Sequence, residues 1–268
     1  MAHTKLPTNP NVGLFITCLV DLFRPSVGFA AVKLLQEAGC HVEVPLNQTC
    51  CGQPTYNLGN EKDTRFIARK VVEAFEKYDF VVVPSGSCAG MIKIHYPKLF
   101  VDDPEMIQRL KLLKNKTFEL TSFLIDVMRL ASVANEEPVV RKIRVTYHDS
   151  CSGLRELKIK NQPRELLKNL DNIVLTEYDG AEICCGFGGT FCIKYSEISD
   201  QIVQKSIDKL RQSKADLLLG GDLGCLMNIQ GKLSRLNQNK AGFKMQVRHV
   251  AEVLAGMTEK PSIGESKG

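Results

Sequence analysis

The stretch Gln48-Thr-Cys-Cys-Gly-Gln-Pro54 contains two adjacent cysteines followed by glycine, and the same pattern returns in Cys184-Cys-Gly-Phe-Gly-Gly189. A single cysteine precedes each doublet and another follows it; these are Cys18, Cys88, Cys151 and Cys225. The preceding cysteine is separated from its doublet by 31 residues in one case and 32 in the other, and the following cysteine by 36 and 39. This repeated order, offset by about 133 residues, indicates an internal duplication.

Short apolar runs rich in β-branched residues come before each single cysteine and predict buried β-strands. They are residues 12–17, 80–84, 143–147 and 215–219. Residues 61–78 and 196–213 carry apolar side chains at three- and four-residue spacing and predict helices. A further strand and helix close each half, at residues 118–130 and 245–254. Because strands that alternate with helices form parallel sheets, we expect an α/β protein of two pseudo-symmetric halves, each a small, mainly parallel sheet flanked by helices.

The boundary between the halves is predicted near residues 135–141, where Glu136-Glu137-Pro138 interrupts the helical pattern and polar residues cluster. This places a first cysteine-rich domain at residues 1–138 and a second at residues 139–268. The polar, glycine-containing end of the second domain, from Met257 to Gly268, is predicted to be a flexible tail.

The overall composition is that of a globular protein with a sizeable core, since 44% of the 268 residues are hydrophobic and 24% are charged. The net charge of +5 is spread along the chain, so no nucleic-acid surface is predicted. No run approaches the roughly 18 apolar residues of a membrane span, and the amino end lacks the apolar core of a signal peptide. We therefore expect a cytoplasmic protein whose ten cysteines stay reduced.

Loops that leave parallel strands converge at the carboxyl edge of a sheet, and the repeated cysteines fall in such loops. Each half contributes four sulfurs: Cys18, Cys50, Cys51 and Cys88 in the first, and Cys151, Cys184, Cys185 and Cys225 in the second. Glycine after each doublet permits the turn that two adjacent thiols need to face one site. Four soft thiolates suit an iron–sulfur cluster or zinc, and the lack of Cys-x2-Cys knuckles favours the cluster. Buried cysteines without a function are the third interpretation, which the duplication disfavours.

These motifs, together with Gly86-Ser-Cys-Ala-Gly-Met91 and Tyr147-His-Asp-Ser-Cys151, resemble the cysteine-rich CCG domains of heterodisulfide reductase catalytic subunits and glycolate oxidase iron–sulfur subunits. Two such domains fill residues 12 to about 256 without an attached ferredoxin domain, and in this the chain is similar to the lactate utilization protein A family. The resemblance implies an iron–sulfur electron-transfer component that works with two partner polypeptides in a bacterial system oxidising L-lactate to pyruvate. It makes the chain a subunit of an oxidoreductase complex and assigns it no catalytic residue.

One departure from the heterodisulfide reductase pattern affects the predicted centre. That pattern ends in Cys-x-x-Cys, whereas this chain has Met91 and Asn228 in the last position, so both halves lack a fifth sulfur. We therefore expect one four-thiolate [4Fe–4S] cluster in each half. The alternatives are a subunit for another 2-hydroxy acid such as glycolate, a heterodisulfide-reductase-like thiol oxidoreductase, and a scaffold held by zinc.

Three further residues have open roles. Cys192 follows the second doublet closely and is a candidate extra ligand, while Cys40 begins an apolar run and is predicted to be a buried strand thiol. His148 is a candidate for hydrogen bonding to a cluster sulfur or for moving a proton, and equally for a structural role. The glycines at residues 186–189 lack the rest of a dinucleotide fingerprint, so no NAD or flavin site is predicted.

Overall fold

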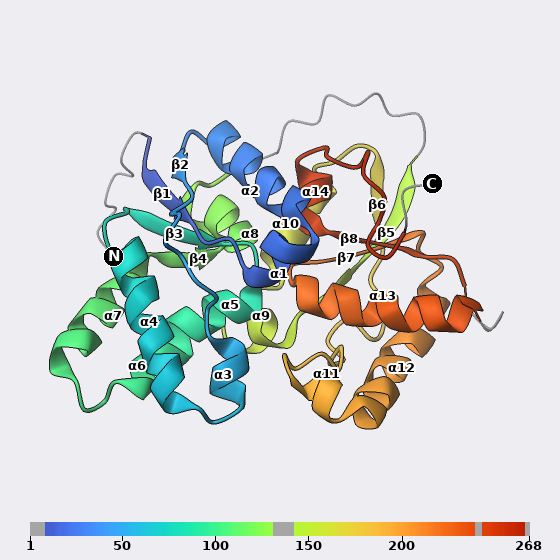
Figure 1. Ribbon diagram of the computed structural model, residues 1–268. Coiled ribbons are helices and arrows are strands. Elements are labelled where there is room, and N and C mark those ends of the chain that lie inside the picture. Colours follow the sequence, from blue (N-terminus) through green and yellow to red (C-terminus); the bar gives the residue numbers. More distant parts are fainter. Residues whose placement is uncertain (1–8, 131–141, 239–242, 266–268) are drawn as a thin grey trace.

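The computed structural model describes residues 9–130, 142–238 and 243–265, and Figure 1 shows the two halves of the chain side by side. The elements of the first half are β1 (Asn11–Leu14), α1 (Cys18–Phe23), α2 (Pro25–Glu37), β2 (His41–Glu43), α3 (Gln53–Asn57), α4 (Glu61–Phe75), β3 (Phe80–Val83), α5 (Gly86–Gly90), the π-helix η1 (Met91–His95), α6 (Tyr96–Leu99), α7 (Pro104–Lys116), β4 (Thr117–Glu119), α8 (Leu120–Ser122) and the π-helix η2 (Phe123–Val127).

The second half repeats the alternation of strands and helices. Its elements are β5 (Ile143–His148), α9 (Cys151–Arg155), α10 (Asn161–Lys168), β6 (Ile173–Leu175), α11 (Phe191–Lys194), α12 (Ser196–Ser213), β7 (Leu217–Gly220), α13 (Leu223–Gln238), β8 (Gln246–His249) and α14 (Val250–Leu254).

Each half contains a four-stranded sheet in which every neighbouring pair of strands is parallel. The strand orders are β2-β1-β3-β4 and β6-β5-β7-β8, so the two sheets have the same topology. The central strands also pair in the same register, since Leu14 lies opposite Val82 and Tyr147 lies opposite Leu219. Strands β3 and β7 are almost entirely buried, which explains their continuous apolar sequences. The predicted fold class is confirmed.

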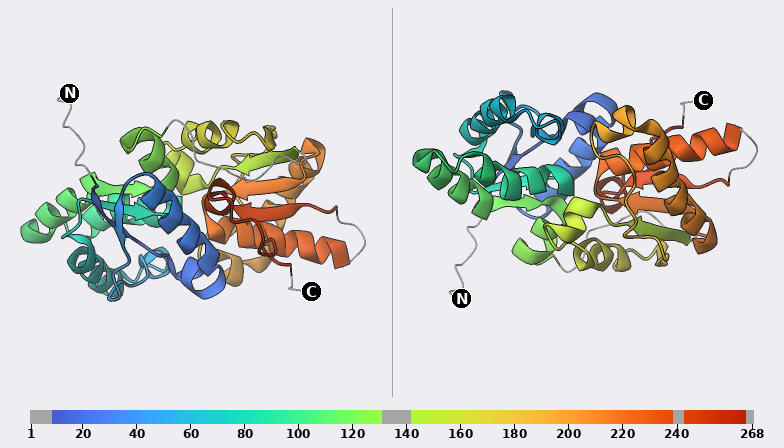
Figure 2. Two further views of the ribbon diagram at one scale, coloured as in Figure 1. Left: turned by 90° about the horizontal axis from the view of Figure 1, so that it is seen from above. Right: turned by 90° about the horizontal axis from the view of Figure 1, so that it is seen from below.

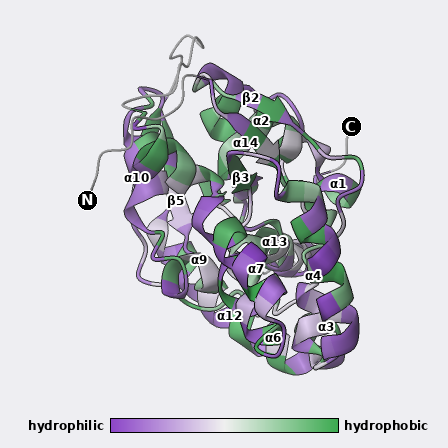
Figure 3. Ribbon diagram, turned by 90° about the vertical axis from the view of Figure 1, so that its left-hand side faces the viewer, coloured by the Kyte–Doolittle hydropathy of each residue, from purple (hydrophilic) through white to green (hydrophobic). Residues whose placement is uncertain are grey.

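The long helices follow the predicted apolar spacing closely. Helix α12 covers the predicted residues 196–213, and α4 ends three residues before the predicted end at residue 78. Helix α4 begins after Asn60, whose side chain accepts a hydrogen bond from the Asp63 backbone N–H at 3.2 Å. Figure 3 shows hydrophilic and hydrophobic residues mixed along α4 and α7, as expected for helices with one face on the core.

The two halves are joined by packed helices and a buried ion pair. Helix α2 contacts α14, α1 contacts α13, and α5 contacts α9, and both views in Figure 2 show the halves flanking this junction. Arg24 Nε donates to Glu252 Oε1 at 2.9 Å, and the same carboxylate oxygen accepts from Ser26 Oγ at 2.6 Å. Residues from both halves, including Val12 and Val145, belong to one continuous apolar cluster.

The predicted boundary at residues 135–141 lies outside the described residues. The composition predicts a flexible tail, but its described part is anchored on β8, because the Ile263 N–H donates to the Val247 carbonyl at 2.9 Å and Ile263 is buried. Across the described residues, the search for a helix with the length and apolar character of a membrane span finds none.

Candidate metal centres

The repeated cysteines lie where chain segments leave the central strands of each sheet. Cys18 and Cys151 are the first residues of α1 and α9, which follow β1 and β5. Cys88 and Cys225 are the third residues of α5 and α13, which follow β3 and β7. In open α/β sheets, ligands bind at the carboxyl ends of the adjacent strands where the strand order reverses. Both sets of cysteines occupy that position.

The four thiols of the first half form one connected group. Cys50 Sγ lies 3.6 Å from Cys18 Sγ, and Cys51 Sγ lies 3.1 Å from Cys88 Sγ. Hydrogen bonding between Cys50 and Cys51 connects the two pairs. All four are free thiols, since a disulfide would place two sulfurs about 2 Å apart. We call this group the first quartet.

The second quartet is built in the same way. Cys185 Sγ lies 2.8 Å from Cys225 Sγ, and Cys184 is close enough to Cys151 and Cys185 for both thiols to lower its pKa. These four cysteines are also free thiols. The structure therefore brings together, in each half, the four sulfurs that the repeat groups in the sequence.

A glycine in the left-handed region turns each doublet. The φ angles are +75° at Gly52 and +78° at Gly186, a conformation that side chains other than glycine adopt rarely. In both turns the glycine N–H points back to the first thiol of the doublet, with N–Sγ distances of 3.4 Å to Cys50 and 3.4 Å to Cys184. A Cβ at Gly186 would lie only 2.7 Å from the Ser199 carbonyl oxygen. The turn thus depends on glycine for both conformation and space.

A hydrogen bond also fixes the carbonyl of the second cysteine in each doublet. The Tyr96 hydroxyl donates to the Cys51 carbonyl at 2.8 Å, and Asn228 Nδ2 donates to the Cys185 carbonyl at 2.7 Å. Asn228 occupies the position of the missing fifth cysteine of the second half, while its counterpart Met91 is buried in the core. Asn228 therefore holds the second doublet in place, whereas Met91 fills part of the core of the first half.

The hydrogen bonds within each quartet favour a thiolate on the first cysteine of the doublet. Hydrogen bonding from Cys18, then from Cys51 and the Gly52 N–H, lowers the pKa of Cys50. Cys184 has the same arrangement, with Cys151 as the main cause of its lowered pKa. Hydrogen bonding to these two thiolates, together with burial, raises the pKa of the neighbouring thiols Cys18, Cys51, Cys151 and Cys185. Each quartet thus shares protons that a bound metal would displace.

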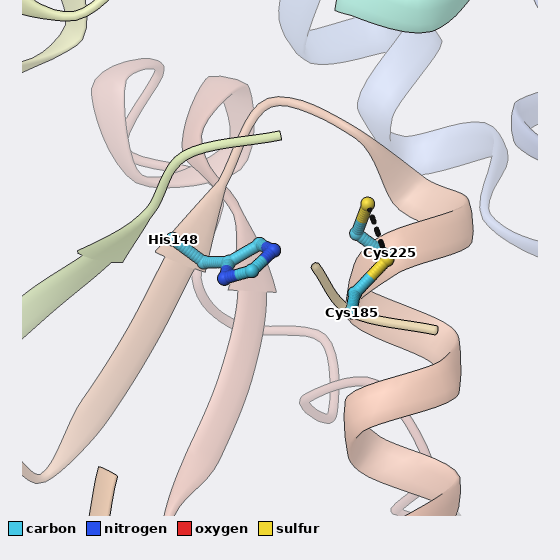
Figure 4. Close-up of side chains that lie close together, drawn as sticks. All are labelled: His148, Cys185 and Cys225. Atoms are coloured by element: carbon cyan, nitrogen blue, oxygen red, sulfur yellow. Dashed lines mark hydrogen bonds between the residues drawn. The ribbon is translucent and has the colours of Figure 1, made fainter. Parts of the chain in front are cut away.

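His148 lies beside the second quartet, as Figure 4 shows. The ligand atoms of His148, Cys185 and Cys225 are all within 4.8 Å of one another. His148 Nδ1 lies 3.1 Å from the Tyr178 hydroxyl, whereas Nε2 is buried and has no hydrogen-bond partner among the described residues. Burial lowers the pKa of His148 to about 4, so the ring is neutral.

A cavity of about 140 Å³ lies between the first quartet and the second half. All four cysteines of the first quartet line it, and Phe187, Thr190 and Asp222 line it from the second half. Asp222 is the only Asp, Glu, Lys or Arg among the described lining residues. The cavity therefore presents thiols, hydroxyls and one carboxylate, without a cationic side chain.

Asp222 also ties the two quartets together. Its buried carboxylate accepts hydrogen bonds from Ser85 Oγ at 2.8 Å, from the Ser87 backbone N–H at 2.9 Å and from Ser87 Oγ at 2.7 Å. Ser85 and Asp222 each stand three residues before the last cysteine of their quartet. Sequence reasoning did not find this contact, because it forms only when the two halves pack together.

The two remaining cysteines lie apart from the quartets. Cys40 is buried, with its Sγ 4.0 Å from Met128 Sδ, in agreement with the predicted buried thiol. Cys192 Sγ donates to the Gly189 carbonyl at 3.5 Å, and its described hydrogen bond is not to the second quartet. Its candidate role as an extra ligand stays a prediction.

The donor sets fit a metal or cluster held by thiolates. Each quartet offers four free thiols at one end of its sheet, with Sγ atoms in contact in the pairs Cys18–Cys50, Cys51–Cys88 and Cys185–Cys225. Soft thiolate sets of this kind bind iron–sulfur clusters and zinc. The second site offers an imidazole in addition. The residues present therefore suit a metal-containing centre in each half.

Comparison with known proteins shows which family has the same pattern of cysteines. The cysteine-rich domain family CCG matches the chain twice, at residues 12–93 and 145–230, and each match contains one quartet. The chain is 46% identical over 243 residues to lactate utilization protein A of Geobacillus thermodenitrificans and 42% identical to that of Bacillus subtilis. Both alignments cover 91% of this chain and 98% of the relative. The chain belongs to the lactate utilization protein A family.

A solved structure supports the fold alone. A hypothetical protein from Helicobacter pylori aligns with a TM-score of 0.60 at 12% identity. The alignment covers 98% of this chain and 52% of that protein, so this chain spans about half the length of its structural relative.

Proposed function

We propose that this protein is an iron–sulfur electron-transfer component of a lactate-oxidising system, with one [4Fe–4S] cluster held by each cysteine quartet. The observation that carries the proposal is the convergence of four free thiols at the same strand ends in both halves. The name of the relatives, lactate utilization protein A, supports lactate as the substrate of that system.

The ligands proposed for the first cluster are Cys18, Cys50, Cys51 and Cys88, and those for the second are Cys151, Cys184, Cys185 and Cys225. Bound there, a cluster supplies a centre that accepts and releases one electron at a time. The chain's own residues prepare the site: the glycine turns orient the doublets, and the N–H groups of Gly52 and Gly186 face the first thiolate of each doublet. These donors favour the negative charge of a cluster held by thiolates.

The removal of hydrogen from lactate belongs, in this proposal, to a partner protein. Oxidation of L-lactate to pyruvate releases two electrons and two protons, and two clusters can take the electrons singly. The cavity beside the first quartet has no cationic side chain to bind the lactate carboxylate and contains the carboxylate of Asp222. A second carboxylate would be repelled there, which supports a role in relaying electrons rather than in binding lactate.

The experiment is an anaerobic redox titration of the purified protein, with iron, sulfide and zinc measured in the same sample. We expect iron and sulfide in equal amounts, and uptake of one electron for each half when dithionite is added stepwise. We expect L-lactate alone to leave the visible absorption unchanged. Zinc in place of iron would overturn the cluster assignment, and bleaching by L-lactate alone would overturn the assignment of the chemistry to a partner.

A further inference from the structure

The two quartets differ in the residue that lies behind the doublet. His148 stands three residues before Cys151, and Phe15 stands three residues before Cys18. The pairing of the central strands confirms that these positions are equivalent, because the residues just before them, Leu14 and Tyr147, pair with corresponding residues of β3 and β7. One site is therefore backed by a phenyl ring and the other by an imidazole.

The surroundings of the two rings differ accordingly. Phe15 is fully buried, belongs to the same apolar cluster as Cys51 and Cys88, and packs on Phe75 with ring centroids 5.3 Å apart. His148 is also buried, at 1% exposure, but its Nε2 has no hydrogen-bond partner among the described residues. A buried polar atom without a partner is costly, so an unpaired nitrogen facing two thiols indicates an interaction with whatever those thiols hold.

We propose that His148 donates a hydrogen bond from Nε2 to a sulfur of the second centre and thereby makes that centre easier to reduce than the first. This inference rests on the proposed function, since it requires a redox centre in each half. The Tyr178 hydroxyl lies 3.1 Å from Nδ1, close enough to donate a hydrogen bond to that nitrogen, and in the proposed arrangement it does so, which leaves the ring proton on Nε2. Tyr178 stands six residues before the second doublet. The residue six positions before the first doublet is Val44, which has no hydroxyl.

The duplication indicates that His148 is a hydrogen-bond donor to the second centre rather than one of its metal ligands. The first quartet assembles its four thiols with phenylalanine at this position, so four sulfurs complete the set without an imidazole. The second quartet has the same four sulfurs in the same order along the chain. The N–H group is thus an addition to a complete set of ligands.

The physical consequence is a difference in reduction potential. Reduction adds negative charge to the centre, and an N–H donor pointing at a sulfur stabilises that charge more than it stabilises the oxidised state. The first centre has only an apolar ring in the same place. Electrons that enter the first centre are then drawn to the second.

The test compares His148→Phe, which gives the second half the residue of the first, with His148→Gln, which keeps an N–H donor. The midpoint potential of each centre is measured in the full-length, cluster-loaded protein by redox titration followed by paramagnetic resonance. Cys50→Ser, which removes a ligand of the first centre only, assigns the signals. Tyr178→Phe provides a milder variant that retains the imidazole.

We expect His148→Phe to lower the midpoint potential of the second centre by about 59 mV. At a fixed potential, this one-electron shift changes the ratio of reduced to oxidised centre about tenfold toward the oxidised form. The first centre keeps its potential, His148→Gln restores part of the shift, and Tyr178→Phe gives a smaller shift in the same direction. If both variants at position 148 load both centres and neither they nor Tyr178→Phe moves the potential, the inference fails while the proposed function stands. Loss of iron from the second site alone in both variants at position 148 would make His148 a ligand and overturn the donor role. A wild-type protein without iron would instead overturn the proposed function.

Discussion

The two halves of this molecule share a sulfur framework but differ in the polar groups around it. In both, a glycine N–H faces the first thiol of the doublet and a side chain holds the carbonyl of the second. Phe15 and Ile16 stand three and two residues before Cys18. His148 and Asp149 stand at the same distances before Cys151. The two halves thus share the arrangement of the thiols, while the second site has the more polar surroundings.

This difference extends into the support behind the second site. Asp149 is buried and accepts two hydrogen bonds of 2.8 Å from Arg164, which also pairs with Glu177. The first half has no charge at the equivalent position, where the Ile16 N–H instead donates to Gln48 Oε1 at 2.8 Å. The positions of the thiols are therefore set by backbone turns common to both halves, while the charged groups around them differ.

The largest expected effect is the loss of one centre at a time. Cys50→Ser and Cys184→Ser each remove the thiol whose pKa is lowered in its quartet, so each is expected to lose about half of the iron and sulfide of the wild type. The double variant is expected to lose nearly all of it. Metal and sulfide analysis of anaerobically purified protein gives the result. Full iron retention in either single variant would break the equivalence of the two sites.

The second prediction concerns the ion pair that only the second half has. Arg164→Met leaves the buried carboxylate of Asp149 without its partner, and such an uncompensated charge costs about 3–5 kcal/mol in the free energy of unfolding. Arg144→Met is the matched control, since the Arg144–Asp216 pair is exposed and is expected to be worth less than about 1 kcal/mol. Urea unfolding of both variants makes the measurement. Equal small losses would show that the polar support is dispensable.

The third prediction concerns another pair of equivalent positions, Glu119 and His249, which are the last residues of β4 and β8 and cap the next helix. Burial raises the pKa of Glu119 to about 7 from its ordinary 4.5. Its contribution to stability is therefore complete below pH 4.5 and is lost as the pH rises through 7, by at most about 3 kcal/mol. Glu119→Gln keeps the hydrogen-bond acceptor and is expected to flatten this loss between pH 5 and pH 8.

His249 acts in the opposite direction. Burial lowers its pKa, so its contribution to stability is present above its ordinary value of 6.5 and is lost as the pH falls below it. His249→Asn keeps a side chain that can cap the helix and is expected to flatten the acid side of the stability profile. Thermal unfolding as a function of pH compares the two variants. Glu119→Gln is expected to remove a loss of stability that occurs as the pH rises, and His249→Asn to remove a loss that occurs as the pH falls; a change of the same sign in both variants would contradict the assigned pKa directions.

The smallest effects are expected at the cysteines outside the repeat. Cys192→Ala and Cys40→Ala remove thiols that bond the Gly189 carbonyl and contact Met128, respectively, so both are expected to retain the full iron content. Cys40→Ala is expected to lose about 1 kcal/mol of stability because its thiol is buried. Iron analysis together with urea unfolding checks both. A loss of iron in Cys192→Ala would make this cysteine a ligand that distinguishes the second half.

Much of this architecture could be predicted because the signals are local. The spacing of apolar residues defines α12, and the apolar runs before Cys18 and Cys151 identify central strands, since periodicity and strand composition depend on neighbours in the chain. The similar spacing of the cysteines in the two halves comes from the duplication, and it predicts which four sulfurs belong together in each half. Strand β6 was not predicted, although Ile173-Val-Leu175 is apolar and β-branched, because a run of three residues is too short to distinguish a strand at the edge of a sheet from a loop.

Features that depend on contact between distant segments could not be predicted. The hydrogen bonds from Ser85 and Ser87 to Asp222 exist only once the two halves pack together. The orientation of His148 depends in the same way on Tyr178, which lies 30 residues further along the chain. The described part of the tail is anchored by two buried residues, Ser262 and Ile263, within a polar segment whose average composition predicts no packing.

The central claim is that two quartets of thiolates hold two iron–sulfur clusters in one chain, and native mass spectrometry of the anaerobically purified protein tests it most directly. The account predicts a mass above that of the polypeptide by two cores of four iron and four sulfide each, falling to one core in Cys50→Ser and in Cys184→Ser. A mass equal to the polypeptide alone, or increased only by zinc ions, would contradict it.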